Sequence, residues 1–283
     1  MAFKIQVEDR VPTYPGRVLL VPVAGEVDTY DLERADLPVV EGTPINKRLF
    51  DSKADCLSED AVVYVSPTGS DTEGDGGEDA PFRTIQAAID ALPKNLGSHT
   101  VEISVEFGVY TERVVVNGFT SGRLIIGRYG EVFTIVGGID IINSSFVETN
   151  IYQIERDTSS SRPLFVAKDG SNVSVSSDMI LDGIDTGVTG MIVENNSHLV
   201  TANNIKITCN NCGMAIVAQW CSFVSVNSIT GSNNMFGVSA TQGGIISYKT
   251  DTLSKMWSNN ADSGGLVLTG KNSSDLSDAT LDL

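Results

Sequence analysis

The second half of the chain repeats one short block: Gly190-Met-Ile-Val-Glu-Asn-Asn196, Gly213-Met-Ala-Ile-Val-Ala-Gln219, Gly237-Val-Ser-Ala-Thr-Gln242 and Gly265-Leu-Val-Leu-Thr-Gly270. A second set alternates with it: Asn172-Val-Ser-Val-Ser176, His198-Leu-Val-Thr-Ala202, Ser222-Phe-Val-Ser-Val226 and Gly244-Ile-Ile-Ser-Tyr248. Similar blocks recur about every 22 to 28 residues, which is typical of stacked repeats. Their β-branched, alternating character predicts strands closed by turns. A β-sandwich also has short strands at regular spacing, but it does not repeat its register. The pattern therefore predicts a right-handed parallel β-helix.

Stacking of equivalent positions predicts which side chains fill the interior of this helix, because one coil cannot bury its apolar face alone. One predicted interior row contains Val173, Leu199, Phe223 and Ile245. A second contains Met191, Met214 and Val238, with Leu266 as its next step. Pairs of asparagines then fall at the corners, where a left-handed backbone is needed: Asn195-Asn196, Asn203-Asn204, Asn210-Asn211 and Asn233-Asn234.

Composition narrows the class of protein. The 283 residues carry a net charge of −17, which argues against nucleic acid and anionic membrane surfaces as partners. Hydrophobic residues make up 41% and aromatic residues only 7%, which suits a narrow aliphatic core. No apolar run is long enough for a membrane span, and the first ten residues lack the apolar segment of a signal peptide. We expect synthesis in the bacterial cytoplasm, without membrane insertion and without export by the general route.

The four cysteines do not form a recognisable metal site. Cys209 and Cys212 have the spacing of a zinc or redox pair, but no second pair of ligands accompanies them. Cys56 and Cys221 are isolated. We therefore predict buried, reduced thiols in the wall of the helix, and neither a metal ion nor a cofactor.

Residues 1–57 form a separate region that carries five of the nine prolines, with strands predicted at Arg17–Val23 and Thr29–Arg34. The runs Tyr14-Pro-Gly-Arg-Val18, Tyr30-Asp-Leu-Glu-Arg-Ala-Asp36 and Glu41-Gly-Thr-Pro-Ile-Asn46 resemble the amino-terminal segment of tail-associated structural proteins from phages and prophages of Gram-positive bacteria. The resemblance implies attachment to the particle, through other tail or baseplate proteins. The alternative is a small β-hairpin subdomain with no particular role.

Residues 58–283 form the predicted β-helix. Within them, residues 84–92 predict a helix with Thr84 as N-cap, placed across the open first coil. Three runs resemble the opening of the pectin lyase-like superfamily, in the pattern of pectin methylesterases: Ala80-Pro-Phe-Arg-Thr-Ile-Gln-Ala-Ala-Ile-Asp-Ala-Leu92, Gly108-Val-Tyr-Thr-Glu-Arg-Val114 and Thr134-Ile-Val-Gly-Gly138. The resemblance implies the fold and not the activity. The block at Gly138–Asn143 comes too early to supply the catalytic aspartate of the esterases, and no arginine follows Arg162.

Candidate site residues fall into two groups. Glycoside hydrolysis needs two carboxyl groups facing one groove, and the candidates are Asp178, Asp182 and Asp185, with Glu194 on the same or the next coil. Asp182 and Asp185 also lie beside Gly183 and Gly187, which is ordinary turn composition. Sugar binding without cleavage needs exposed aromatic rings, and the candidates are Trp220, Tyr248 and Trp257. Packing under a loop or at a subunit seam is the alternative for these rings.

These features together predict a virion protein of the phage tail. We expect a homotrimeric tail spike or tail fibre-like protein that binds a bacterial surface polysaccharide and does not cleave it. The alternative is a polysaccharide depolymerase, either a glycoside hydrolase or a lyase. A carbohydrate esterase is a third possibility, suggested only by the runs between residues 64 and 138.

Overall fold

The computed structural model describes residues 57, 59–128, 130–185, 187–257 and 260–269, and at residues 250–251, 254–257 and 260 only the backbone. It also describes five short strands: Val11–Pro12 (β1), Val18–Pro22 (β2), Tyr30–Arg34 (β3), Pro38–Val40 (β4) and Thr280–Leu281 (β23). The chain divides into two compact units, Met1–Ala54 and Asp55–Leu283. In the first unit β1 pairs with β4 and β2 pairs with β3, both antiparallel. Most of the predicted attachment region lies outside the described residues.

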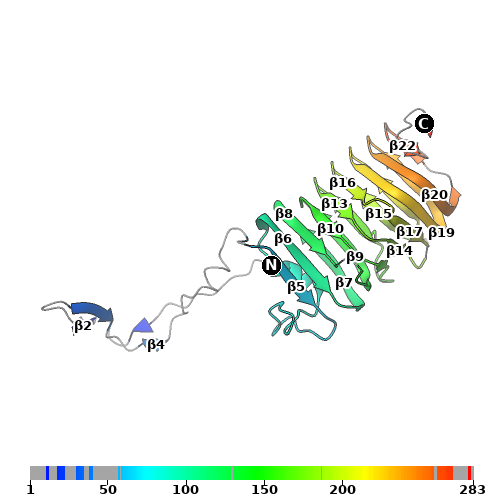
Figure 1. Ribbon diagram of the computed structural model, residues 1–283. Coiled ribbons are helices and arrows are strands. Elements are labelled where there is room, and N and C mark those ends of the chain that lie inside the picture. Colours follow the sequence, from blue (N-terminus) through cyan, green and yellow to red (C-terminus); the bar gives the residue numbers. More distant parts are fainter. Residues whose placement is uncertain are drawn as a thin grey trace. The chain divides into compact units, whose positions relative to one another are not determined.

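The second unit is a parallel β-helix with three walls (Figure 1). The first wall contains Ala61–Val65 (β5), Asn95–Val105 (β6), Ser121–Ile126 (β8), Val147–Thr149 (β10), Asn172–Val175 (β13), His198–Thr201 (β16), the first parts of Phe223–Thr241 (β19) and Ile245–Trp257 (β20), and Leu266–Thr269 (β22). The second contains the first halves of Gly108–Asn117 (β7) and Phe133–Ile142 (β9), then Gln153–Glu155 (β11), Met179–Asp182 (β14), Lys206–Asn210 (β17) and the middle parts of β19 and β20. The third contains the second halves of β7 and β9, then Phe165–Lys168 (β12), Thr189–Val193 (β15), Met214–Ala218 (β18), the end of β19 and Asn260–Asp262 (β21). The predicted single-stranded parallel β-helix is confirmed, and the architecture is compatible with a pectin lyase-like fold.

The first wall shows where the predicted side-chain register is right and where it is wrong. Its interior row is Val101, Leu124, Val147, Val173, Leu199, Val224, Ile246 and Val267. The prediction is correct for Val173 and Leu199. It is wrong for Phe223 and Ile245, which pair with His198 and Leu266 in a row on the outer face. A shift of one residue moves a strand's side chains to the opposite face, and the second residue of the block points inward at Val173 and Leu199 but outward at Phe223 and Ile245.

The predicted interior row is also partly wrong in the third wall. Met191 and Val238 do lie in one interior row, together with Phe165 and Ile216. Met214 does not belong to it, because Ile216 occupies the interior position and Met214 is 37% exposed. The interior residue follows the block glycine directly after Gly190 and Gly237 but three residues after Gly213. Leu266, the predicted next step, belongs to the first wall.

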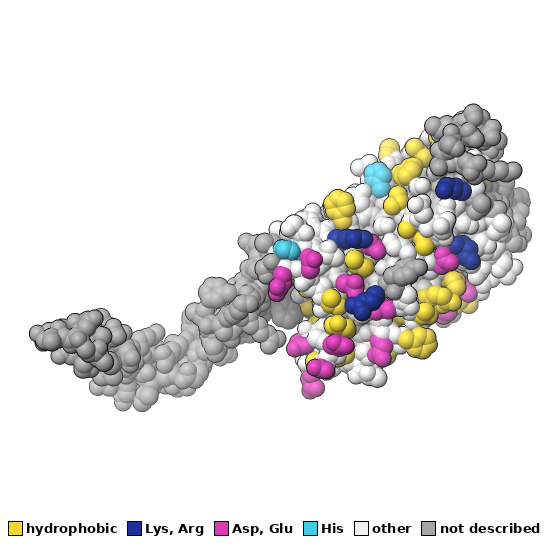
Figure 2. Space-filling model, viewed as in Figure 1, with side chains coloured by type: hydrophobic (Ala, Val, Ile, Leu, Met, Phe, Trp, Pro, Cys, Tyr) yellow, Lys and Arg dark blue, Asp and Glu magenta, His cyan; other side chains and the backbone are white. Residues whose placement is uncertain are grey.

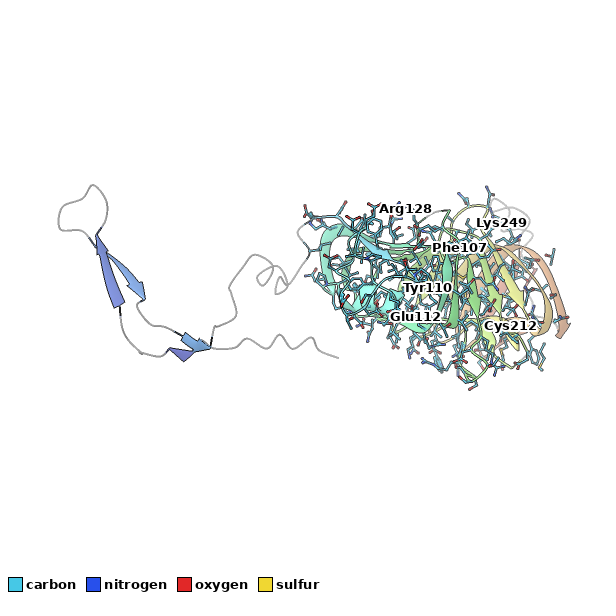
Figure 3. The ribbon with its side chains drawn as sticks, turned by 90° about the horizontal axis from the view of Figure 1, so that it is seen from below. Phe107, Tyr110, Glu112, Arg128, Cys212 and Lys249 are labelled. Carbon is cyan, nitrogen blue, oxygen red and sulfur yellow. The ribbon has the colours of Figure 1, made fainter. Side chains whose placement is uncertain are left out.

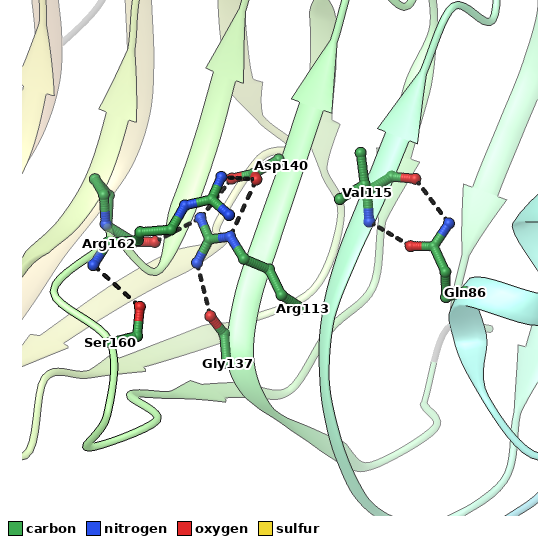
Figure 4. A network of polar contacts seen from close by, with 8 residues as sticks. Gln86, Arg113, Val115, Gly137, Asp140, Ser160 and Arg162 are labelled. Carbon is green, nitrogen blue, oxygen red and sulfur yellow. Dashed lines mark hydrogen bonds and ion pairs between the residues drawn. The ribbon is translucent and has the colours of Figure 1, made fainter. Parts of the chain in front are cut away.

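A short helix, Ile85–Asp90 (α2), lies beside the first coil and buries Ile85, Ala88 and Ile89. Thr84 is its N-cap, as predicted, and accepts a hydrogen bond from the backbone N–H of Ala87 at 3.1 Å. The side-chain amide of Gln86 makes two hydrogen bonds with the backbone of Val115 in β7, accepting at 2.7 Å and donating at 3.2 Å (Figure 4). The amide thus occupies the place where the next strand of a sheet would pair with Val115. No helix in the described parts of the chain is long and apolar enough to cross a membrane.

Two sets of polar residues recur at the corners between the walls. The predicted left-handed conformation occurs at several corner asparagines, with φ between +54° and +64°: Asn195, Asn196, Asn204, Asn211 and Asn233. The second set is a buried ladder of serines at the corner between the third and first walls: Ser144, Ser171, Ser197 and Ser222. Each hydroxyl after the first accepts a hydrogen bond from the backbone N–H of the preceding serine, at 3.1 to 3.2 Å. The ladder therefore satisfies backbone donors that a tight corner would otherwise leave without partners.

Replacement of Ser171 with alanine should lower the free energy of unfolding by about 1–3 kcal/mol, because the buried N–H of Ser144 would lose its acceptor. The matched control is Ser174→Ala three residues later, on the outer face of β13, which should change stability by less than about 0.5 kcal/mol. Urea denaturation followed by circular dichroism measures both. Equal effects of the two variants would contradict a structural role for the ladder.

Candidate carbohydrate-binding groove

The predicted catalytic carboxylates are held by other protein groups. Asp182 accepts hydrogen bonds from the backbone N–H of Ile184 and from the side-chain amide of Asn211, both at 2.9 Å. The Asn211 side chain in turn accepts from Asn233 at 3.2 Å, so Asp182 begins a ladder of amides along the corner. Asp185 forms an ion pair with Arg156 and closes the turn to Gly187. These contacts match the turn function that their composition suggested.

Glu194 lies at a different corner. It follows β15, whereas Asp182 and Asp185 precede this strand, and it accepts a hydrogen bond from Gln219 at 2.8 Å. Five residues of extended chain span ~16 Å, beyond the ~5–10 Å that separates the two carboxyl groups of a glycosidase. The structure therefore does not bring Glu194 together with the two aspartates across one groove.

The two predicted sugar-binding aromatic side chains that the structure describes, Trp220 and Tyr248, do not share a surface either. Trp220 lies at a corner with a φ of +52° and is 44% exposed, so its ring is accessible. Tyr248 is only 5% exposed, in the interior of the first wall beside Val226. The side chain of Trp257 lies outside the described residues.

Cys209 and Cys212 lie in the core. Burial raises the pKa of the Cys212 thiol to about 12 and also raises the pKa of Cys209, so both stay protonated at neutral pH. Cys221 is exposed, and Cys56 lies outside the described residues. Within the described ranges no group of three histidine, cysteine, aspartate or glutamate side chains converges to hold a metal ion.

A groove of about 580 Å³ does occur at the corner between the first and second walls. We call it the corner groove, and its main lining residues are Glu131, Val132, Tyr152, Asp178, Asn203 and Asn204. Unequal corner lengths create the hollow. Six residues connect β8 to β9 and four connect β16 to β17, whereas only three connect β10 to β11 and β13 to β14. The two short corners are recessed between longer ones, over three coil steps of ~4.8 Å, or ~14 Å in length.

The groove offers an apolar surface at one end and free polar groups at the other. Tyr152 is 40% exposed and Val132 is 42% exposed. Asn203 and Asn204 are exposed, and their side-chain amides have no hydrogen-bond partner among the described residues. One carboxylate oxygen of Asp178 accepts the backbone N–H of Lys206 at 2.8 Å, which leaves the other oxygen open. An accessible ring beside unpaired amide and carboxylate groups is the arrangement that binds the faces and hydroxyl groups of sugars.

Glu131 in this groove is held firmly by the protein. Its carboxylate accepts hydrogen bonds from the Ser104 hydroxyl at 2.8 Å, the Val105 N–H at 2.9 Å and the Arg128 N–H at 2.7 Å. Both of its oxygens are therefore occupied. This carboxylate shapes the long corner between β8 and β9.

The exposed apolar surface continues beyond the groove onto the first coil. Phe107, which follows β6, is 78% exposed, whereas Tyr110 three residues later is buried (Figure 3). Burial raises the pKa of the Tyr110 hydroxyl far above its usual value, and this hydroxyl donates to the Glu106 carbonyl oxygen at 2.9 Å. Phe107, Val132 and Tyr152 thus lie on successive coils of the same corner.

No sequence motif marks Tyr152 as a site residue, because the groove depends on relative corner lengths. The sequence indicates this groove only through the position of Tyr152, an aromatic residue directly before a short strand. On the face shown in Figure 2, apolar side chains are scattered along the β-helix, and acidic side chains are most numerous around the first coils. No protein-family model matches the chain, and the searches found no curated protein and no solved structure significantly similar to it.

Proposed function

We propose that the protein recognises a bacterial surface polysaccharide through the corner groove and does not cleave it. The observation that supports this function is the exposed Tyr152 ring in the same groove as the unpaired amides of Asn203 and Asn204, two coils further along. The length of the groove, ~14 Å, suits a short run of sugar units. An open groove with few charged groups favours binding to a neutral or amphipathic glycan face.

Binding without cleavage is favoured by the state of the carboxylates. A glycosidase needs one carboxyl group free to donate a proton and another free to act as base or nucleophile. In the groove, Glu131 is saturated by hydrogen bonds and Asp178 uses one oxygen to fix Lys206. Elsewhere, Asp182 belongs to a corner ladder and Asp185 to an ion pair.

We propose further that the protein works in the tail of a phage or prophage particle, as a homotrimer. The resemblance of residues 1–57 to tail-associated proteins supports the location. Partly exposed apolar residues on the β-helix walls, such as Val62 and Val109, support association of several copies. Light scattering of the full chain tests the stoichiometry, for which three times 30.1 kDa is expected. A monomer in solution would overturn the trimer.

Replacement of Tyr152 with alanine should weaken glycan binding about tenfold, a loss of about 1.4 kcal/mol. The measurement is a screen of the full chain against a glycan array and against purified surface polysaccharides of Gram-positive bacteria, followed by titration of the best ligand. Tyr152→Phe keeps the ring and should retain most of the affinity.

The matched control is Trp220→Ala, which removes an equally exposed ring at another corner and should leave binding unchanged. Binding that is lost in Trp220→Ala and kept in Tyr152→Ala would place the site elsewhere. Release of reducing ends from the bound polysaccharide would show a depolymerase instead.

A further inference from the structure

The serine ladder reveals one irregular corner. From Ser171, Ser197 and Ser222 the chain reaches the next interior residue of the first wall after two positions, at Val173, Leu199 and Val224 respectively. From Ser144 it needs three positions to reach Val147. This corner therefore contains one extra residue, which makes it the equivalent of a β-bulge in the stack.

The extra residue pushes Phe146 out of the stack. Its φ of +57° lies in the left-handed region, which bulky side chains rarely adopt, and its side chain is 64% exposed. A large aromatic residue in strained backbone gains nothing here from packing. Trp220 and Ile184 combine left-handed backbone with exposure in the same way, so the feature that distinguishes Phe146 is the groove that it borders.

Phe146 borders a second groove, of about 360 Å³, on the outer face of the first wall. We call it the face groove, and the residues that the argument uses are Arg123, Phe146, Glu148, Asn172 and His198. It is separate from the corner groove, with which it shares no lining residue. The strand register explains its composition, because Asn172 and His198 are neighbours in one outward row and Glu148 lies in the next.

Several polar groups of the face groove can donate hydrogen bonds to a ligand. Arg123 is 54% exposed and uses one terminal nitrogen to pair with Glu148, whose side chain is 14% exposed. The remaining guanidinium N–H groups, the Asn172 amide and the His198 imidazole have no hydrogen-bond partner in the described part of the chain. Among the described residues that line this groove, Glu148 is the only carboxylate, and it pairs with Arg123.

We propose that the face groove binds an anionic sugar unit, with the sugar ring against Phe146 and its carboxylate or phosphate group on Arg123. Guanidinium forks bind both anions through paired hydrogen bonds. The Asn172 amide and the His198 imidazole lie on the same face and supply further donors. This site does not depend on the corner groove or on its proposed ligand.

The test is a titration of the full chain, at fixed low ionic strength, with glucose, glucuronate and glucose 1-phosphate, followed by chemical-shift changes or calorimetry. At least one anion should bind more than fivefold tighter than glucose, and the preferred anion assigns carboxylate or phosphate. Phe146→Ala and Arg123→Gln should each weaken that binding at least fivefold, with the folded state checked by circular dichroism. Tyr152→Ala in the corner groove should leave it unchanged.

Glu148→Gln separates ligand binding from a purely structural ion pair. Loss of the negative charge frees the Arg123 fork, so anion binding should become about fivefold tighter. If the pair only stabilised the wall, Glu148→Gln and Arg123→Gln would weaken binding together. Weaker binding in both variants would overturn the proposal. So would equal affinity for glucose and both anions, or no binding of either anion.

Discussion

Replacement of Arg113 with methionine should lower the free energy of unfolding by about 3–5 kcal/mol. Asp140 projects from the third wall but is only 2% exposed, and the Arg113 guanidinium donates to its carboxylate through both Nε and Nη2 (Figure 4). The same guanidinium donates to the carbonyl oxygens of Gly137 at 2.7 Å and Pro163 at 2.9 Å. Without it, a buried carboxylate and two carbonyl groups lose their principal donor. Urea denaturation of the two proteins measures the difference.

Arg162→Met is the matched control, because Arg162 pairs with the same carboxylate from a position that is 58% exposed. Solvent screens this second ion pair, so its removal should cost no more than about 1 kcal/mol. The double variant Arg113→Met/Asp140→Leu should recover much of the loss, since it removes the buried charge as well. Equal, small effects of Arg113→Met and Arg162→Met would show that the carboxylate tolerates either partner.

The Asp140 cluster illustrates what repeats can and cannot predict. Alternation between Ile139 and Ile141 places Asp140 on the outer face, and the resemblance to the esterases drew attention to its block. Its burial comes from Arg113 on the preceding coil and from Arg162 in the loop before β12. The Arg162 contact does not follow from a periodic pattern, because its loop belongs to one coil alone. The Arg113 contact does not follow either, because it joins one arginine and one aspartate that do not recur on the other coils.

The β-helix itself was predictable because its period recurs in both sets of blocks. Stacking made the strands and the asparagine corners recognisable, and the N-cap at Thr84 was recognisable from its place before an apolar helical face. The grooves were not predictable in this way. The corner groove arises from short corners between long ones, and the face groove from one extra residue before Val147. Both grooves depend on differences between coils, whereas repeats are recognised by what the coils have in common.

The second prediction with a large effect concerns the first wall, where either Phe223 or Val224 can point inward in an alternating strand. Val224 is fully buried in the interior row between Leu199 and Ile246, whereas Phe223 lies on the outer face against His198, with ring centroids 6.4 Å apart. Val224→Asp would place an unpaired charge in an aliphatic interior and should destabilise the protein by at least about 4 kcal/mol. Phe223→Asp should cost no more than about 1.5 kcal/mol, the loss of partial burial. Guanidinium denaturation and thermal unfolding compare the two.

The register of the first wall is tested by which of the two variants loses more stability, because a shift of the strand by one residue would make Phe223→Asp the more destabilising one. Should Val224→Asp yield no folded protein, Val224→Thr serves instead. It keeps the shape and adds one buried hydroxyl group, at a cost of about 1–3 kcal/mol. A larger loss for Phe223→Asp than for Val224→Asp would place Phe223 inside. It would also turn His198 inward with it, since the two residues share one row, and the face groove would then lose its imidazole.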